Sequence, residues 1–200
     1  MKQEEKTRLT RQKITDAAIN EFGIMGYEKA NINSISASGI AKGLIYHNFE
    51  SKDELYIECL KRCFEEITRA LACPENTADY SAYFERRIAV FRERKAPAAM
   101  VLEALIDPPQ RHMETISELR RQYDEMNNEW ITNILKNGRL REGVDMQSAL
   151  KYLSLMQDMY NWYCTSPKFS GSGLGGMLEL HERSLPGIFE YMLFGVMKGE

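Results

Sequence analysis

Cationic and hydrogen-bonding side chains gather in residues 27–55 of the chain. Lys42 and Lys52 lie at or near the expected starts of two helices, where free backbone N–H groups attract phosphate and a lysine adds positive charge. Tyr46 and His47 are expected to project from the helix that Lys42 begins, toward phosphates or base edges. Unless these two are ordinary surface residues, the pattern indicates a surface that binds DNA.

Small and polar residues around the two lysines complete this predicted surface. Gly43, early in the expected recognition helix, lets the backbone approach phosphates despite a helix-propensity cost of about 1 kcal/mol. Ile45 and Phe49 are expected to pack back on the first helix instead. The predicted DNA-binding residues are Asn31, Asn33, Ser34, Ala41, Lys42, Gly43, Leu44, Tyr46, His47, Asn48 and Lys52.

Two of the four cysteines, Cys59 and Cys63, are four residues apart and would share one helix face. Such a pair could hold a metal or sense redox state, but its neighbours on that face are apolar, and free cysteine is usually buried. No second ligand pair of zinc-site spacing follows. We expect core packing, no metal, and reduced thiols here and at Cys73 and Cys164.

A glycine-rich run at residues 171–176 has the spacing G-x-G-x-x-G. A dinucleotide site needs a strand before the first glycine, but an aromatic helix and Pro167 precede this run. We expect a flexible connection before the last helix rather than a cofactor site. Because G-x-S-x-G, H-E-x-x-H and P-loop motifs are also missing, we expect neither an enzyme nor a cofactor.

The elements that position these residues are helices, because apolar residues recur at helical spacing nearly everywhere and no alternating strand pattern competes. A first helix is expected to end at Gly23 and Gly26. Short helices at 31–38 and 41–49, joined by a tight turn at Gly39, form a helix-turn-helix.

The rest of the chain is predicted to form a larger helical domain. A capping box of Ser51 and Glu54 opens a fourth helix that ends before Pro74. We place the domain boundary between residues 1–54 and 55–200. Further helices are expected at 80–94, 98–106, 113–136 and 145–164, and in a last region bearing residues 178–196 that Pro186 interrupts or kinks.

Residues 27–55 resemble the DNA-binding domain of the TetR family of transcriptional regulators. The family pattern has Val-x-x-Ile-Ala followed by Ala-Gly-Val-Ser-Lys-Gly-x-Leu-Tyr-x-Tyr-Phe-x-Ser-Lys-Glu-Glu-Leu. The resemblance extends over about residues 10–70, with the helix-turn-helix at about 31–50. The matching positions are Ile35, Gly39, Ile40, Lys42, Gly43, Ile45, Tyr46, Phe49, Ser51, Lys52 and Leu55.

The chain departs from the family pattern at several of its positions. Without a hydroxyl, Ala41 loses a phosphate contact or a helix cap, so details of operator binding are expected to be unusual. The departures are Ala30 for Thr, Ser36 and Ser38 for Ala, Ala41 for Ser or Thr, and Asn48 for an aromatic residue.

The resemblance implies a ligand-responsive regulator, with repression the expected effect. In the family, a dimer reads a palindromic operator, and ligand binding in the C-terminal domain displaces the fourth helix. The helices at about 145–164 and 177–197 are the expected dimer contacts.

Aromatic and methionine side chains cluster in the larger domain and favour either core and dimer packing or a pocket for a small apolar effector. The predicted pocket residues are Met100, Tyr123, Met126, Trp130, Tyr152, Met156, Met159, Tyr160 and Tyr163.

The class of effector is open between two interpretations. The run 118–125 and the segment 160–163 are similar to those of TetR-type regulators that sense acyl-CoA thioesters, and Arg120 and Arg121 would then meet phosphates, or else form a solvated face. The alternative is a multidrug-type sensor, with Asp158 and Glu103 completing a cage for aromatic cations.

Two further classes compete with a DNA-binding regulator. One is an all-α metal- or thiol-dependent protein that uses Cys59, Cys63 and a histidine. The other is a helical interaction module without DNA binding, for which the motif at 27–55 would be a coincidence.

The composition of the chain limits the classes of protein to which it can belong. The chain has 200 residues, 44% hydrophobic and 28% charged, as expected of one large or two small globular domains. No run approaches the ~20 apolar residues of a membrane span, and the N-terminus lacks the apolar part of a secretory signal, so we expect a cytoplasmic protein. Residues 1–49 carry seven Lys and Arg against five acids, and residues 50–200 carry 19 against 24, which permits DNA binding without showing it.

Overall fold

The computed structural model describes residues 3–72, 79–166 and 173–196, and these ranges contain helices and no strands. The prediction of an all-α fold is confirmed. The helices are α1 Gln3–Lys29, α2 Ile32–Ala37, α3 Lys42–Asn48, α4 Lys52–Leu71, α5 Tyr80–Glu93, α6 Lys95–Ile106, α7 Met113–Asn137, α8 Met146–Cys164 and α9 Gly173–Phe194, with a 3-10 turn η1 at Gln110–His112.

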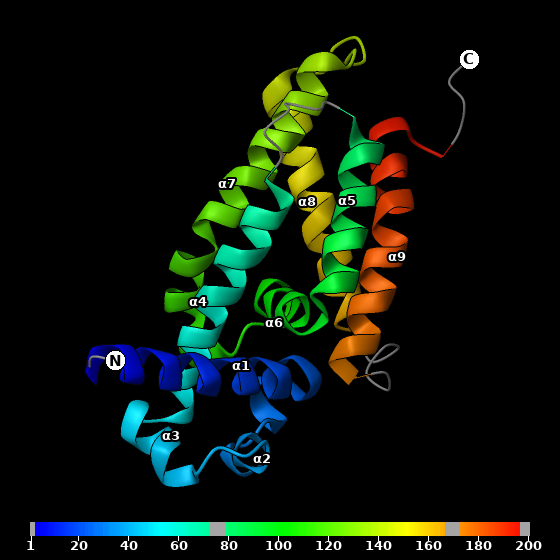
Figure 1. Ribbon diagram of the computed structural model, residues 1–200. Coiled ribbons are helices and arrows are strands. Elements are labelled where there is room, and N and C mark those ends of the chain that lie inside the picture. Colours follow the sequence, from blue (N-terminus) through cyan, green and yellow to red (C-terminus); the bar gives the residue numbers. More distant parts are fainter. Residues whose placement is uncertain (1–2, 73–78, 167–172, 197–200) are drawn as a thin grey trace.

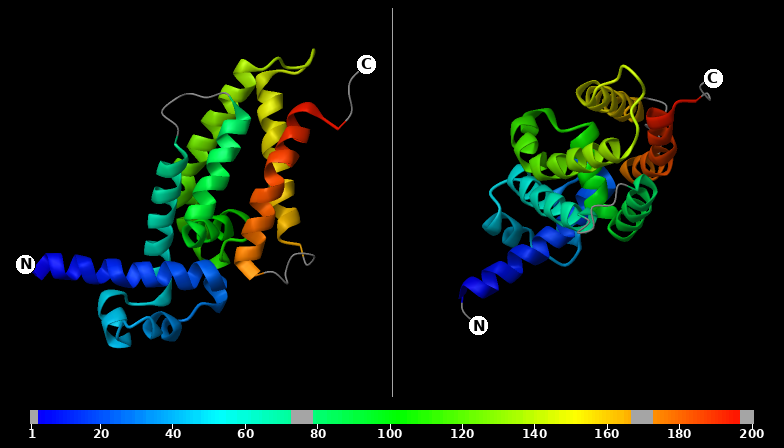
Figure 2. Two further views of the ribbon diagram at one scale, coloured as in Figure 1. Left: turned by 45° about the vertical axis from the view of Figure 1, so that its right-hand side comes forward. Right: turned by 90° about the horizontal axis from the view of Figure 1, so that it is seen from above.

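The helices form two layers of unequal size (Figure 1). The first layer consists of α1 with α2 and α3 beneath it. The second is a bundle of α4, α5, α7, α8 and α9, whose long axes run away from α1, with α6 lying across its base. Figure 2 shows that the N-terminal turns of α1 project beyond the bundle.

Helix α1 passes through Gly23 and leaves helical geometry at Gly26, where φ is 75° and ψ is 166°. Only glycine adopts such a backbone readily, so Gly26 ends the helix as predicted. The prediction that Gly23 also ends it is wrong. A Cβ built on Gly23 would lie 2.6 Å from the backbone of Ala96, so this glycine allows α1 to pack closely on α6.

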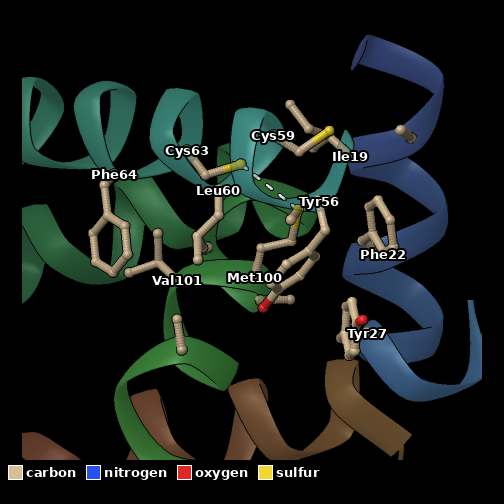
Figure 3. Packing of buried hydrophobic residues seen from close by; sticks show 14 of the residues in the cluster. Ile19, Phe22, Tyr27, Tyr56, Cys59, Leu60, Cys63, Phe64, Met100 and Val101 are labelled. Atoms are coloured by element: carbon tan, nitrogen blue, oxygen red, sulfur yellow. Dashed lines mark hydrogen bonds between the residues drawn. The ribbon is translucent and has the colours of Figure 1, made fainter. Parts of the chain in front are cut away.

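One apolar core joins the two layers. It runs from Phe22 of α1 and Ile45 of α3 into α4, α6 and α7 without a break. Figure 3 shows its centre, where the Cys63 thiol points toward the Met100 sulfur at 3.8 Å. The predicted division after residue 54 therefore cuts through continuous packing, because α4 contributes to both layers.

A second core cluster holds α5, α7, α8 and α9 together. The ring of Trp130 stacks on Tyr83, with centroids 3.8 Å apart, and on Phe189, with centroids 5.2 Å apart. Next to this apolar cluster the bundle buries an ion pair: Arg87 of α5 donates to both carboxylate oxygens of Glu182 of α9, at 2.6 and 2.8 Å.

Tyr123 of α7 and His181 of α9 complete this buried ion pair. Arg87 also donates to the Tyr123 hydroxyl at 2.7 Å, and His181 Nδ1 lies 2.9 Å from Glu182. Burial opposes ionisation of Glu182, but the charge of Arg87 and the hydrogen bond with His181 hold the pKa of that carboxyl below its usual value. Each charged atom thus has a partner, which a buried charge requires.

The structure contradicts the predicted loop in the C-terminal region and one of the two alternatives predicted for Pro186. Helix α9 already includes residues 173–176, so that part of the glycine-rich run is not a loop, while 171 and 172 lie outside the described ranges. The helix is extended because Leu174 and Leu178, one turn apart, are both buried in the core. Pro186 does not interrupt α9, which continues to Phe194.

Candidate nucleic-acid interface

Helices α2 and α3 form the predicted helix-turn-helix, and local side chains determine where each begins. Asn31 caps α2: its Oδ1 accepts from Ser34 N at 3.0 Å, and its Nδ2 donates to Ser34 Oγ at 2.9 Å. Gly39, with φ of 95°, makes the turn. Ala41 precedes α3 without a side-chain cap, as expected from its lack of a hydroxyl.

The inward face of α3 is buried and orients the rest of the helix. Ile45 is 1% exposed and belongs to the main core. At about 100° per residue, Gly43 and His47 then face away from the protein, with Leu44 and Tyr46 on the two flanks. All four are exposed, and Figure 1 shows that α3 itself lies on the side of the first layer away from the bundle.

Arg11 of α1 supports α3 from the other side, a role that the sequence alone did not indicate. Its guanidinium lies 4.1 Å from the centre of the Phe49 ring and donates to the carbonyl of Asn48. Arg11 also lies 3.9 Å from Glu54. These contacts hold the C-terminal end of α3 against α1.

The eleven predicted DNA-binding residues lie on α2 and α3, at the residue that precedes each of these two helices, and at the first residue of α4. Besides Ser34, whose Oγ accepts from Asn31, three of them use their polar groups within the protein. Asn31 caps α2, Asn48 Nδ2 donates to the Leu44 carbonyl at 2.9 Å, and Lys52 Nζ donates to the Glu28 carbonyl at 3.3 Å. Lys52 Nζ also lies 4.7 Å from the centre of the Tyr27 ring.

A polar cluster joins this surface to the bundle at the end of α1. Glu103 of α6 accepts from the backbone N–H of Tyr27 at 2.9 Å and from the Tyr56 hydroxyl at 3.5 Å. The Tyr27 hydroxyl donates to Asp53 at 2.5 Å and lies 3.4 Å from His112 Nε2. The end of α1, the start of α4, helix α6 and the α6–α7 connection therefore meet at one point.

Burial raises the pKa of Glu103 from 4.5 to about 7, even though the hydrogen bonds from Tyr27 and Tyr56 favour its charged form. Because the folded-state pKa is raised, Glu103 contributes stability below pH 4.5, and that contribution is lost as pH rises through about 7. We expect Glu103→Gln, which keeps an acceptor for Tyr27, to become more stable relative to the natural chain by on the order of 2 kcal/mol between pH 5 and 8.

Thermal unfolding of the two chains across that pH range measures the effect. The comparison isolates Glu103 because Asp53, His112 and Arg111 are the same in both. A difference in stability that does not change with pH would contradict the prediction.

The nine predicted pocket residues do not line one pocket in the described chain. Met100 and Tyr123 belong to the main core with Met126 packed against it, whereas Tyr160 belongs to the second cluster with Trp130 and Met156 beside it. The other three, Tyr152, Met159 and Tyr163, are each about half exposed on α8.

The structure bears on two charge-based predictions about the effector. The cage for an aromatic cation does not assemble, because Glu103 lies in the polar cluster at the end of α1 while Asp158 is exposed on α8. Arg120 pairs with Asp124 one turn along α7, at 2.7 Å, and Arg121 is exposed.

Cys59 and Cys63 are buried core residues, as predicted, and burial raises the pKa of both thiols. The described residues hold no group of three His, Cys, Asp or Glu side chains suited to a metal. Cys164 is buried as well, and Cys73 lies outside the described ranges. Among the described helices, none has the length and apolar composition that crossing a membrane would need.

An apolar surface runs along α8 and the end of α9, two helices in contact on the side of the bundle away from α4 (Figure 2). Its members on α8 recur every three or four residues and so share one helix face. This exposed apolar surface consists of Tyr152, Leu155, Met159, Trp162 and Tyr163 on α8, and of Tyr191 and Phe194 on α9.

Fold and surface together define a helix-turn-helix protein with a second, larger helical domain. Residues 14–59 match the model of the family described as "Bacterial regulatory proteins, tetR family". The chain is 32% identical over 72 residues to IcaR of Staphylococcus aureus, a negative transcriptional regulator of the biofilm operon icaADBC. That match covers 36% of this chain and 39% of the relative.

Solved structures share the fold over nearly the whole chain. The transcriptional regulator FadR from Bacillus subtilis, in complex with stearoyl-CoA, has a TM-score of 0.59 and 17% identity, and the match covers 93% of this chain and 99% of that one. The TetR family regulator PfmR from Thermus thermophilus has a TM-score of 0.55 and 19% identity, covering 92% and 99%. The N-terminal part of this chain is a TetR-family DNA-binding domain, and the whole chain has the fold of that family's transcriptional regulators.

Proposed function

We propose that this protein is a transcriptional repressor that binds a palindromic operator as a homodimer and is released by a small apolar effector. The observation that carries the proposal is α3: its inner side is buried through Ile45 and clamped by Arg11, while its outer side presents Gly43 and His47. A helix held in this way, with Lys42 at its start, is suited to the major groove.

The apolar surface on α8 and α9 supports the homodimer. Contiguous exposed apolar surface is unusual on a monomer and marks an interface. Both helices are those predicted to pair, over about 145–164 and 177–197. Two chains joined there would present two copies of α3 to half-sites about one helical turn, ~34 Å, apart.

A long-chain acyl-CoA is the effector class that we favour. The FadR structure with stearoyl-CoA has the same fold, and methionine side chains inside the bundle, such as Met100 and Met126, can adapt their shape to an apolar ligand. The contact of Glu103 with Tyr27 supports a route from the bundle to the end of α1, which α2 follows along the chain. A coupling of about 1 to 3 kcal/mol along it would change operator affinity 5- to 150-fold.

Fluorescence anisotropy on duplex from the gene's own upstream region, against scrambled duplex, tests the proposal. We expect a strong preference for the upstream duplex at physiological salt, two chains per palindrome, and release by long-chain acyl-CoAs. Binding that acyl-CoAs leave intact would refute this effector class alone. Lack of preference for any genomic duplex would refute the regulator and favour a metal- or thiol-dependent protein or an interaction module.

Gly43→Ala separates stability from DNA binding. A Cβ at Gly43 would meet no atom within 4 Å, so the variant should be more stable by up to about 1 kcal/mol. The added methyl group lies where α3 would come nearest to DNA, so operator affinity should fall about tenfold or more. Gly175→Ala on α9, also in open space, is the matched control and should keep full affinity. Equal affinities of the two variants would contradict the placement of α3 in the groove.

A further inference from the structure

We infer that Leu44 reads operator sequence by contact with the C5 methyl group of a thymine. The inference rests on the proposed function, because it requires α3 to enter the major groove. It adds the chemistry of one base position to that function.

Leu44 is an exposed apolar side chain that lies outside both core clusters of the described chain. It is 41% exposed, although the next residue, Ile45, is 1% exposed. Leu44 belongs to neither core cluster and is not among the apolar side chains that pack against them.

Because of the residues around Leu44, the flank of α3 that carries it is apolar where a DNA duplex would approach. On the same flank, the Asn48 amide is turned back and donates to the Leu44 carbonyl at 2.9 Å. Gly43, before it, has no side chain and has open space around it. On the other flank, Tyr46 is 50% exposed and presents a hydroxyl that can bond a phosphate.

The chemistry of the major groove then selects the partner. Base edges there display hydrogen-bond donors and acceptors, and thymine alone adds an apolar group, its C5 methyl. A leucine pressed against a donor or acceptor would remove its water without replacing the hydrogen bond. Against the methyl group, the same leucine buries apolar surface from both partners.

Deoxyuridine in place of thymine provides a direct test, because it removes only the C5 methyl. The full-length protein would first select its preferred duplex from a random pool. Its affinity is then measured for that duplex made with thymine and with deoxyuridine throughout. Loss of one buried methyl group should lower affinity about 4-fold per half-site, or about 15-fold for two half-sites.

Leu44→Ala and a neighbouring variant show whether Leu44 is the residue that senses the methyl group. We expect Leu44→Ala to bind both duplexes equally, about as weakly as the natural chain binds the deoxyuridine duplex. His47→Ala, on the outward face of the same helix, should retain the full ratio between the two duplexes. Folding does not confound the comparison, since Leu44 lies outside both cores.

Three outcomes would overturn the inference while leaving the proposed function intact. These are equal binding of both duplexes by the natural chain, a ratio that Leu44→Ala retains, and selected half-sites without thymine. A pool from which no duplex is selected is a different result, because it refutes DNA binding itself.

Discussion

Replacing Arg87 by methionine is expected to lower the free energy of unfolding by about 3 to 5 kcal/mol. The substitution removes two charge-assisted hydrogen bonds, at 2.6 and 2.8 Å, and leaves the Glu182 carboxylate buried beside His181. The Tyr123 hydroxyl loses its donor as well. Methionine fills much of the arginine volume, so the loss reports the unpaired charge more than a cavity.

A double variant provides the control for this prediction. Arg87→Met combined with Glu182→Leu removes both charges, and because two desolvated ions are replaced by apolar side chains, most of the lost stability should return. Urea unfolding at one fixed protein concentration measures all four chains of the cycle, since a dimer's stability depends on concentration. A single variant within 1 kcal/mol of the natural chain, or a double variant less stable than either single one, would contradict the argument.

The buried ion pair also shows where sequence-based prediction ends. Arg87 and Glu182 are 95 positions apart, and nothing in the residues around either one indicates the other. Charged side chains are expected at the surface unless a partner is known. Sequence periodicity placed both residues on helices, but the pairing depends on how α5 and α9 pack.

Local signals, by contrast, predicted local structure well. The capping box at the start of α4 is present, with Glu54 N donating to Ser51 Oγ at 3.1 Å. Helices α2 and α3 begin and end within one residue of their predicted bounds, and Asn31 caps α2. Each of these features depends on atoms only a few residues apart, so the short stretch of sequence around it is enough to predict it.

The candidate DNA-binding surface was predictable for the same reason, because its residues come from one continuous stretch. The two parts that sequence reasoning missed come from elsewhere in the chain. Arg11 reaches Asn48 across 37 positions, and Glu103 reaches Tyr27 across 76. Arg11 holds the end of α3 and Glu103 holds the end of α1, and neither is one of the predicted DNA-binding residues, so no motif at the surface indicates them.

Gly23→Ala is expected to lower the free energy of unfolding by about 3 kcal/mol, although alanine is the better helix former by about 1 kcal/mol. Gly23 lies inside α1, where its Cβ would come 2.6 Å from both the Cα and the carbonyl oxygen of Ala96, and 2.8 Å from its Cβ. Two of these three atoms are backbone, so α6 must move away from α1. Since Glu103 is on α6 and Tyr27 is near the end of α1, the same movement should lengthen the hydrogen bond between them and alter operator affinity.

Ala96→Gly, introduced together with Gly23→Ala, tests whether the backbone or the side chain of Ala96 causes the loss of stability. Removing the Ala96 Cβ relieves only the 2.8 Å contact, so we expect less than half of the lost stability to return. Unfolding in urea gives the stabilities, and anisotropy with operator duplex gives the affinities. Full rescue would show that the side chain, not the backbone approach, sets the distance between α1 and α6. A Gly23→Ala chain as stable as the natural one would mean that the two helices separate at no cost, and the polar cluster between Glu103 and Tyr27 could not then couple the bundle to α2.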